Sequence, residues 1–183
     1  MHTRWAMAML AALPALAACG SQAPGPAEAD ATESNRVDTS GNTEVPLAEV
    51  PAEVLAAARA ARPGFTPAEA ESETRDGRRY FDVEGILPDG SEIEFDIMAE
   101  GDLWRVVETQ RDIAFADAPE PVRKAALARD SALAPVRVIE SVQSDGLIIY
   151  ELYATRPGET PERKVEVRWD GSEASVLDQE WAH

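Results

Sequence analysis

The stretch "YFDVEGILPDGSEIEFDI", residues 80–97, decides the fold class, because two alternating segments flank a turn. The second segment alternates apolar and acidic residues: Ile93, Phe95 and Ile97 against Glu92, Glu94 and Asp96. A period of two is typical of a strand with one buried and one polar face. Between the segments, Pro88-Asp89-Gly90 favours a tight turn, since glycine tolerates positive φ. The stretch therefore predicts an antiparallel hairpin.

A helix is predicted upstream of this hairpin and another strand downstream. "PAEVLAAARAAR", residues 51–62, has an early proline, an acid near its start and arginines near its end. Its apolar stripe consists of Val54, Leu55, Ala58 and Ala61. A second turn at residues 100–102 leads into the strand "LWRVVE", residues 103–108.

The same order of patterns recurs in the second half of the chain. "APEPVRKAALARD", residues 118–130, again predicts a helix, and "RKVEVRW" repeats the alternation of "SEIEFDI". We therefore predict an α+β fold of two tandem repeats, each a helix followed by three or four antiparallel strands, with the helices packed on the sheet. The repeats would span residues 46–112 and 113–183. Chance similarity of two amphipathic segments is the alternative.

The pattern of the N-terminal residues indicates a targeting segment. A short basic start precedes the apolar run of residues 6–16, which is shorter than the roughly 20 residues that a membrane-spanning helix needs. "LAAC", ending at Cys19, resembles the lipobox of bacterial lipoproteins, in which the cysteine is lipidated after residues 1–18 are removed. An ordinary Ala-x-Ala cleavage site and a chance cysteine are the alternatives. Residues 19–45 would form a disordered, lipidated linker, because they are rich in Pro, Gly, Ala and acids.

The lipobox resemblance also implies a location. Several acyl chains on Cys19 would anchor the chain stably in a lipid bilayer. Gly20 follows the cysteine, where lipoproteins retained in the inner membrane often carry Asp. The expected site is therefore the periplasmic face of the outer membrane, with the inner membrane as the less favoured alternative.

A second resemblance covers residues 46–181. The "Pro-x-x-Val" start of a helix, "YFDVEG", "DGSEIEFDI" and a "G-x-x-W" strand resemble PepSY-type domains, above all the PepSY-like group of envelope proteins. The fold of the beta-lactamase inhibitor protein uses a similar unit in tandem. The resemblance implies a binding module with peptide, protease or envelope-protein partners.

The composition excludes several function classes. The chain carries 34 Asp and Glu against 17 Lys and Arg, a net charge of −17, which disfavours nucleic acid and favours a basic partner. Its two histidines, His2 and His183, lie at the chain ends, and Cys19 is its one cysteine. Histidine- or cysteine-dependent catalysis and a zinc site are therefore not expected. We predict a non-enzymatic protein without metal or cofactor, although a carboxylate acid–base pair stays open.

A weak candidate partner surface remains. It comprises Glu92, Glu94 and Asp96, next to Asp82 and Glu84 of the neighbouring strand, and the tryptophans Trp104 and Trp181. A solvated acidic face, a calcium site and tryptophans packed in the core are the alternative interpretations.

The predicted function is that of a membrane-anchored periplasmic lipoprotein that binds protein or peptide, with an inhibitory or regulatory effect on an envelope protease. A structural or sensory accessory that acts as a spacer or regulator of an envelope complex, without peptide binding, is the alternative.

Overall fold

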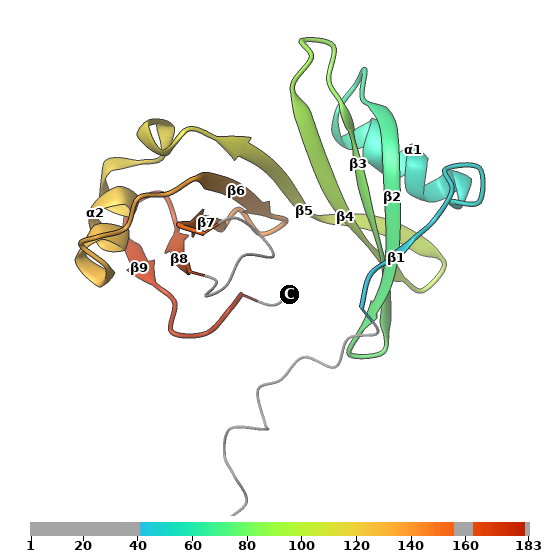
Figure 1. Cartoon of the computed structure of the whole chain (residues 1–183). Helices are drawn as coiled ribbons and strands as arrows, with labels where there is room; N and C mark the ends of the chain where they lie inside the picture. Colours follow the sequence, from blue (N-terminus) through green and yellow to red (C-terminus); the bar gives the residue numbers. More distant parts are fainter. Residues whose placement is uncertain (1–40, 156–162, 182–183) are drawn as a thin grey trace, which may run out of the picture. The chain divides into compact units, whose positions relative to one another are not determined.

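The strands form one antiparallel sheet in which chain order equals spatial order (Figure 1). The computed structural model describes residues 41–155 and 163–181. The strands are β1 Thr43–Glu44, β2 Thr66–Arg75, β3 Arg78–Ile86, β4 Glu92–Glu100, β5 Leu103–Ile113, β6 Arg137–Gln143, β7 Ile148–Tyr153, β8 Lys164–Trp169 and β9 Ala174–Val176. The helices are α1 Ala52–Ala61 and α2 Glu120–Arg129, and a 3-10 turn covers Phe115–Asp117.

The predicted fold class is wrong. The described residues form a single nine-stranded sheet with two short helices, and not two tandem repeats of a helix followed by strands. The physical reason lies in β5, which pairs with β4 on one side and with β6 on the other and so joins all the strands in one sheet. Alternation along a strand predicts its two faces, but it does not say which strands pair on either side.

β5 joins the strands before it to those after it through a short overlap. It pairs with β4 from Leu103 to Gln110 and with β6 from Glu108 to Ile113. The residues of β5 paired on both sides are therefore Glu108, Thr109 and Gln110. A β-bulge interrupts the β4–β5 register between Asp96 and Ile97. The continuity of the sheet thus depends on three central residues of one strand.

The helix expected over residues 51–62 is present as α1. Pro51 is its N-cap residue, and Glu53 lies in the first turn, near the positive end of the helix dipole. The predicted apolar stripe packs on the sheet: Val54 and Ala58 are buried. They pack with Val83, Phe95 and Ile97, and the ring of Phe65 meets that of Phe95 edge to face at 4.9 Å.

The second helix packs on a second apolar cluster. Val122 and Ala126 of α2 are fully buried against Val138, Leu152 and Val167. The strand register places this cluster and the first one on the same face of the sheet, because Phe95 pairs with Thr109 and Thr109 with Val142. Both described helices therefore cover one face.

The hairpin that decided the fold class forms as predicted. β3 and β4 pair from Tyr80↔Met98 to Ile86↔Glu92, and Gly90 adopts a positive φ of 85° in the turn. Gly85 is required for a different reason: a Cβ there would lie 2.2 Å from the carbonyl oxygen of Thr66 and 2.6 Å from the ring of Phe65. The glycine lets β2 and the Phe65 ring approach β3 closely.

The predictions for the N-terminal part of the chain fall mostly on residues outside the described ranges. Residues 1–18, Cys19 and most of the linker lie outside them. Within residues 43–45, expected as linker, β1 pairs with β2, and the amide of Val45 donates to the carbonyl of Ala70 at 2.8 Å. None of the helices in the described ranges is long and apolar enough to cross a membrane.

Candidate functional site

The sheet face opposite the helices carries a row of carboxylates. The register pairs Glu71 with Asp82, Asp82 with Asp96, and Asp96 with Glu108 across four neighbouring strands, β2 to β5. We call these four residues the carboxylate row. Directly opposite side chains in an antiparallel pair have Cβ atoms about 4.5–5.5 Å apart, and like charges there destabilise the sheet. The row therefore concentrates negative charge.

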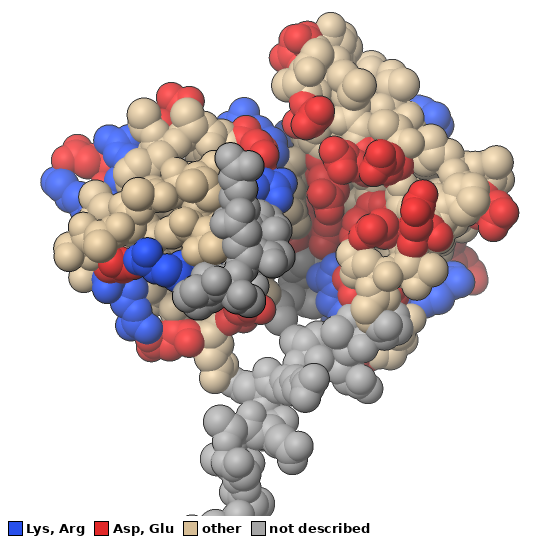
Figure 2. All heavy atoms as spheres, viewed as in Figure 1, with Lys and Arg blue, Asp and Glu red and all other residues tan. Residues whose placement is uncertain are grey.

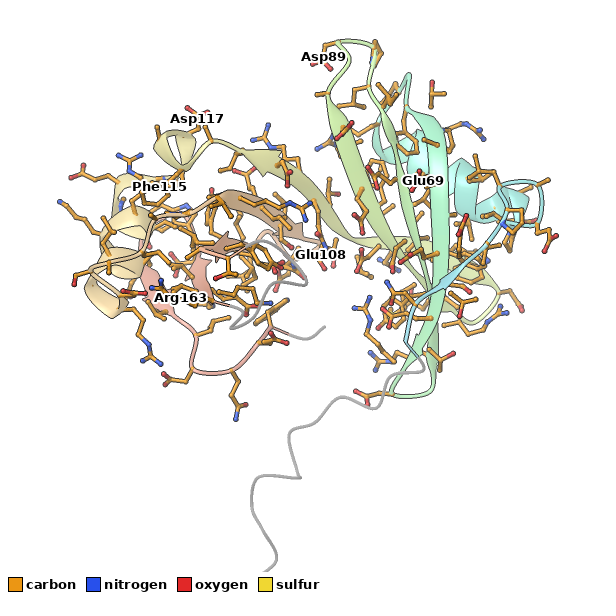
Figure 3. All side chains as sticks on the ribbon, viewed as in Figure 1. Glu69, Asp89, Glu108, Phe115, Asp117 and Arg163 are labelled. Atoms are coloured by element: carbon orange, nitrogen blue, oxygen red, sulfur yellow. The ribbon has the colours of Figure 1, made fainter. Side chains whose placement is uncertain are left out.

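A second row of acids runs beside the first. Glu69 pairs with Glu84, and Glu84 with Glu94. Together the two rows form what we call the acidic face. Figure 2 shows acidic side chains gathered over β2–β4 in this view, and Figure 3 labels Glu69 on β2 and Glu108 on β5. At β6 the carboxylates give way to neutral side chains, because Glu108 pairs with Gln143 and Gln110 with Ser141.

The centre of the acidic face is buried and its margins are exposed. Asp82 has an exposed fraction of 8%, Asp96 and Glu108 each 3%, whereas Glu71 is exposed. Glu94 is half-buried. Removing a carboxylate from water costs several kcal/mol unless a cation or hydrogen bonds replace the water. The buried acids therefore need compensation.

Arg75 supplies part of that compensation. Its guanidinium forms an ion pair with Glu73, lies 3.2 Å from Asp96 Oδ2 and 3.8 Å from Asp82 Oδ1, and stacks over the ring of Tyr80 at 4.4 Å. One cation is thus shared among three carboxylates. Asn42 adds a neutral donor: its Nδ2 lies 2.7 Å from Glu71 Oε2 and 3.4 Å from Asp82 Oδ2.

Two carboxylates remain poorly compensated. Asp82 Oδ1 is buried and accepts no hydrogen bond from the described residues. For Glu94, the described part of the chain provides neither an ion pair nor a side-chain hydrogen bond. A buried acceptor without a donor loses its hydration without replacement. Both groups therefore favour a proton or an incoming cationic donor.

The electrostatics agree with this geometry. Burial, reinforced by the charge of Asp96, raises the pKa of Asp82 to about 8. Burial and then the charges of Asp96 and Glu84 raise the pKa of Glu94 to about 7. Burial and the charges of Glu69 and Glu92 also raise the pKa of Glu84. The acidic face therefore holds protons at a pH where ordinary carboxyls are ionised.

The same face of the sheet is compensated differently at β7 and β8. Lys164 lies 2.8 Å from Glu166, 3.1 Å from Glu180 and 3.4 Å from Glu151. The hydroxyl of Tyr153 also donates to Glu151 at 2.7 Å. These carboxylates accept bonds from a lysine and a phenol within the chain. The fold therefore neutralises acids on this part of the face with a lysine and a phenol, whereas Asp82 has only the shared Arg75 and a long hydrogen bond from Asn42.

A small pocket opens beside Glu94, where β5 leaves β4. It has a volume of about 70 Å³, and its lining includes Glu84, Glu94, Gln110, Asp112 and Arg137. Pockets for small-molecule ligands usually measure about 300–1,000 Å³. The space fits the head group of one side chain rather than a metabolite.

A larger hollow lies where β4 and β5 diverge, with a volume of about 570 Å³. It is lined by Arg62, Leu87, Asp89, Ser91, Glu92, Ile93, Thr109, Arg111, Asp112, Glu140 and Val142. Arg111 is already paired with Glu140 at 2.7 Å. This ion pair neutralises two of the charged groups that line the hollow.

A metal site does not follow from the acids. Across residues 41–155 and 163–181, no group of three or more His, Cys, Asp or Glu residues is arranged to hold a metal ion. Where carboxylates do converge, at Glu73, Asp82 and Asp96, they surround the guanidinium of Arg75. The exposed margin of the acidic face, which includes Glu69, Glu71 and Glu84, is a negatively charged surface.

The candidate residues from the sequence fall in three places. Glu92, Glu94 and Asp96 share one face of β4, with Ile93, Phe95 and Ile97 buried on the other, as the alternation predicted. Trp104 instead packs on the core, edge to face with Phe81 at 5.3 Å and under Arg79. Trp181 is 36% exposed, and its backbone N–H donates to Glu166 Oε2 at 2.7 Å. Cys19 lies outside the described residues.

Sequence reasoning missed Glu71 and Glu108 as members of the site. Glu71 shares a two-residue spacing with Glu69 and Glu73, so the alternation of β2 could have indicated it. Glu108 could not be placed by alternation, because the bulge in β5 puts Val106 opposite Ile97 and Glu108 opposite Asp96. Two residues spaced by two thus face opposite sides of the sheet.

Comparison with known proteins assigns no family to the chain. No protein-family model matches it, and no curated protein matches its sequence.

Proposed function

We propose that this protein is a non-enzymatic, membrane-anchored envelope lipoprotein whose acidic face binds a basic segment of a partner protein or peptide. The observation that carries the proposal is the carboxylate row, which is buried at its centre and incompletely compensated. An extended basic segment matches it in charge.

The geometry favours a peptide over a small molecule. Acids of the acidic face recur on adjacent strands, so they follow a line across the sheet. Adjacent strands lie about 4.8 Å apart, and alternate side chains of an extended segment lie roughly 6–7 Å apart on one face. A lysine- or arginine-rich segment can therefore meet the exposed carboxylates of Glu69, Glu71 and Glu84 together, whereas the pocket beside Glu94 admits one head group.

Titration calorimetry with two short peptides tests this proposal. One peptide alternates Arg and Ser, and the other alternates Glu and Ser. We expect the full chain to bind the basic peptide and not the acidic one. The double variant Glu84→Gln/Glu94→Gln should weaken binding of the basic peptide by about tenfold or more, because it removes two charges and the acceptors at the pocket.

A matched double variant separates a specific face from general attraction. Glu49→Gln/Glu53→Gln removes the same charge from exposed positions at and before α1. It should leave the affinity nearly unchanged. If both double variants lose the same affinity for the basic peptide, the net charge of −17 explains the binding and the acidic face has no specific role. If the unmodified chain does not bind the basic peptide, a spacer or sensory accessory is favoured.

A further inference from the structure

The ladder between β4 and β5 ends before either strand does. Its last pair is Glu94↔Gln110, although β4 begins at Glu92 and β5 continues to Ile113. We call this opening the β4–β5 split. It adjoins the hollow of about 570 Å³, whose lining includes residues of both strands. Within the described residues, the split therefore leaves one edge of each strand without a neighbouring strand.

The backbone N–H and C=O of Asp112 point into the split. Along an antiparallel strand, residues that bond to the neighbour on one side alternate with residues that bond to the neighbour on the other side. In β6, the amide of Gln143 donates to Leu147 on the β7 side at 2.8 Å, and Ile139, four residues earlier, has the same orientation. Asp112 pairs with Ile139 and therefore turns its own polar groups away from β6.

The backbone of Glu92 faces the split from the other strand. The carbonyl of Ser91 accepts a hydrogen bond from the amide of Leu87 at 2.9 Å on the β3 side, so the next residue, Glu92, turns its N–H and C=O to the β5 side. The two strands thus present four backbone polar groups to the split, two from Glu92 and two from Asp112. Open strand edges of this kind are templates for pairing with another chain.

Most charges that line the hollow are already compensated. Glu140 pairs with Arg111 at 2.7 Å, and Asp112 pairs with Arg137 at 2.9 Å. Asp89 accepts two hydrogen bonds within its own turn. The two charged lining residues that remain have opposite signs: Arg62 and Glu92. The hollow therefore favours an uncharged ligand over an ionic one.

An extended polypeptide matches both the open edges and the hollow. A residue paired opposite Asp112 would direct its side chain to the acidic face, and its two neighbours would direct theirs into the hollow. There they would meet three apolar side chains of the lining: Leu87, Ile93 and Val142. The volume of the hollow also lies within the range of about 300–1,000 Å³ that is usual for ligand pockets.

We propose that the β4–β5 split binds an uncharged, extended segment of a partner protein, which adds a short strand beside β5 and inserts apolar side chains into the hollow. The backbone of this segment exchanges hydrogen bonds with Asp112, as strand addition at a sheet edge requires. The segment differs in charge from the basic one proposed for the acidic face. Either proposal can therefore fail without the other.

Hydrogen exchange measured by NMR tests the open edge before any ligand is added. The amide of Gln110 points to β4 and is paired with Glu94, whereas that of Asp112 points into the split. We expect the Asp112 amide to exchange at least about tenfold faster than the Gln110 amide. Equal protection of the two amides would show that the split is closed and would overturn the proposal.

Binding is then measured with the blocked peptide acetyl-Val-Ser-Val-Ser-Val-amide and the full chain. We expect it to bind at millimolar concentration and to slow exchange of the Asp112 amide. The same peptide with methylated backbone nitrogens cannot donate hydrogen bonds and should bind at least about tenfold more weakly. Equal affinity of the two peptides, or no binding of the unmethylated one, would refute strand addition.

A variant that fills the hollow locates the site. Thr109 lines the hollow, so the ring of Thr109→Phe should occupy the space and weaken binding of the unmethylated peptide by about tenfold or more. Ser175→Phe adds the same ring to an exposed position of β9 and should bind normally. Unchanged binding by folded Thr109→Phe would overturn the assignment to the hollow. If that variant does not fold, the comparison of the two peptides decides.

Discussion

Two aspartates in this chain show how strongly local structure sets acidity. Asp170 lies in the turn between β8 and β9, where its Oδ1 accepts the backbone N–H groups of Ser172 and Glu173, and these bonds lower its pKa to about 2. Asp82 lies buried among other acids, and its pKa rises to about 8. Both are Asp residues, and their sequence neighbours alone do not explain the difference.

The raised pKa values make stability depend on pH. The unfolded chain has Asp and Glu pKa values of about 3.9 and 4.3, so between about pH 4 and pH 8 the folded chain holds more protons than the unfolded one. The free energy of unfolding should therefore fall as the pH rises through this range, by at most about 1.4 kcal/mol per pH unit for each carboxyl. Urea unfolding at a series of pH values measures it.

The variant Asp82→Asn/Glu94→Gln should flatten this dependence. The amides of Asn and Gln have a similar shape and do not ionise, so they carry no buried negative charge at high pH. The variant should therefore exceed the unmodified chain in free energy of unfolding by more at pH 8 than at pH 5. Asp170→Asn serves as the control, because its pKa is shifted the opposite way and it should not flatten the decline. A stability profile that rises from pH 5 to pH 8 in the unmodified chain would contradict the assignment.

At the scale of elements, the sequence predicts best where local patterns are strong. The helix at residues 51–62 and the alternation of β4 are both present in the structure. Pairing partners are less accessible, because they depend on contacts between strands distant in sequence. The expectation of two tandem repeats was wrong for this reason, and the bulge in β5 hid Glu108 from a two-residue alternation.

The overlap in β5 should be the most sensitive point of the sheet. Thr109 pairs with Phe95 on one side and Val142 on the other. Thr109→Pro removes a ladder N–H there and leaves a carbonyl without its donor, at a cost of about 1–3 kcal/mol or more. In calorimetry we expect the unmodified chain to unfold in one transition and Thr109→Pro to unfold in two, one for each apolar cluster.

The control for this experiment is Thr109→Ala, which keeps the backbone N–H and should retain one transition with a small loss of stability. If Thr109→Pro also unfolds in one transition at a lower temperature, the strands on the two sides of β5 are coupled by contacts other than the overlap.

At the scale of the whole molecule, the proposed anchor can be tested apart from binding. Cys19 is the single cysteine, so its replacement leaves no other thiol for acylation. In cells labelled with palmitate, Cys19→Ser should abolish incorporation of the label and release the protein from membranes or leave it uncleaved. Ser21→Ala, two residues away, is the matched control and should label normally. Continued labelling of Cys19→Ser would refute the lipoprotein proposal.

Asn42 gives the proposed anchoring a mechanical consequence. Its amide holds Glu71 and Asp82, and β1 follows it directly with two residues paired to β2. A pulling force applied to the chain upstream of Asn42 therefore acts first on these contacts, before it reaches the apolar clusters. Tension on the N-terminal chain would break the hydrogen bonds that Asn42 donates to Glu71 and Asp82, while the rest of the sheet stays folded.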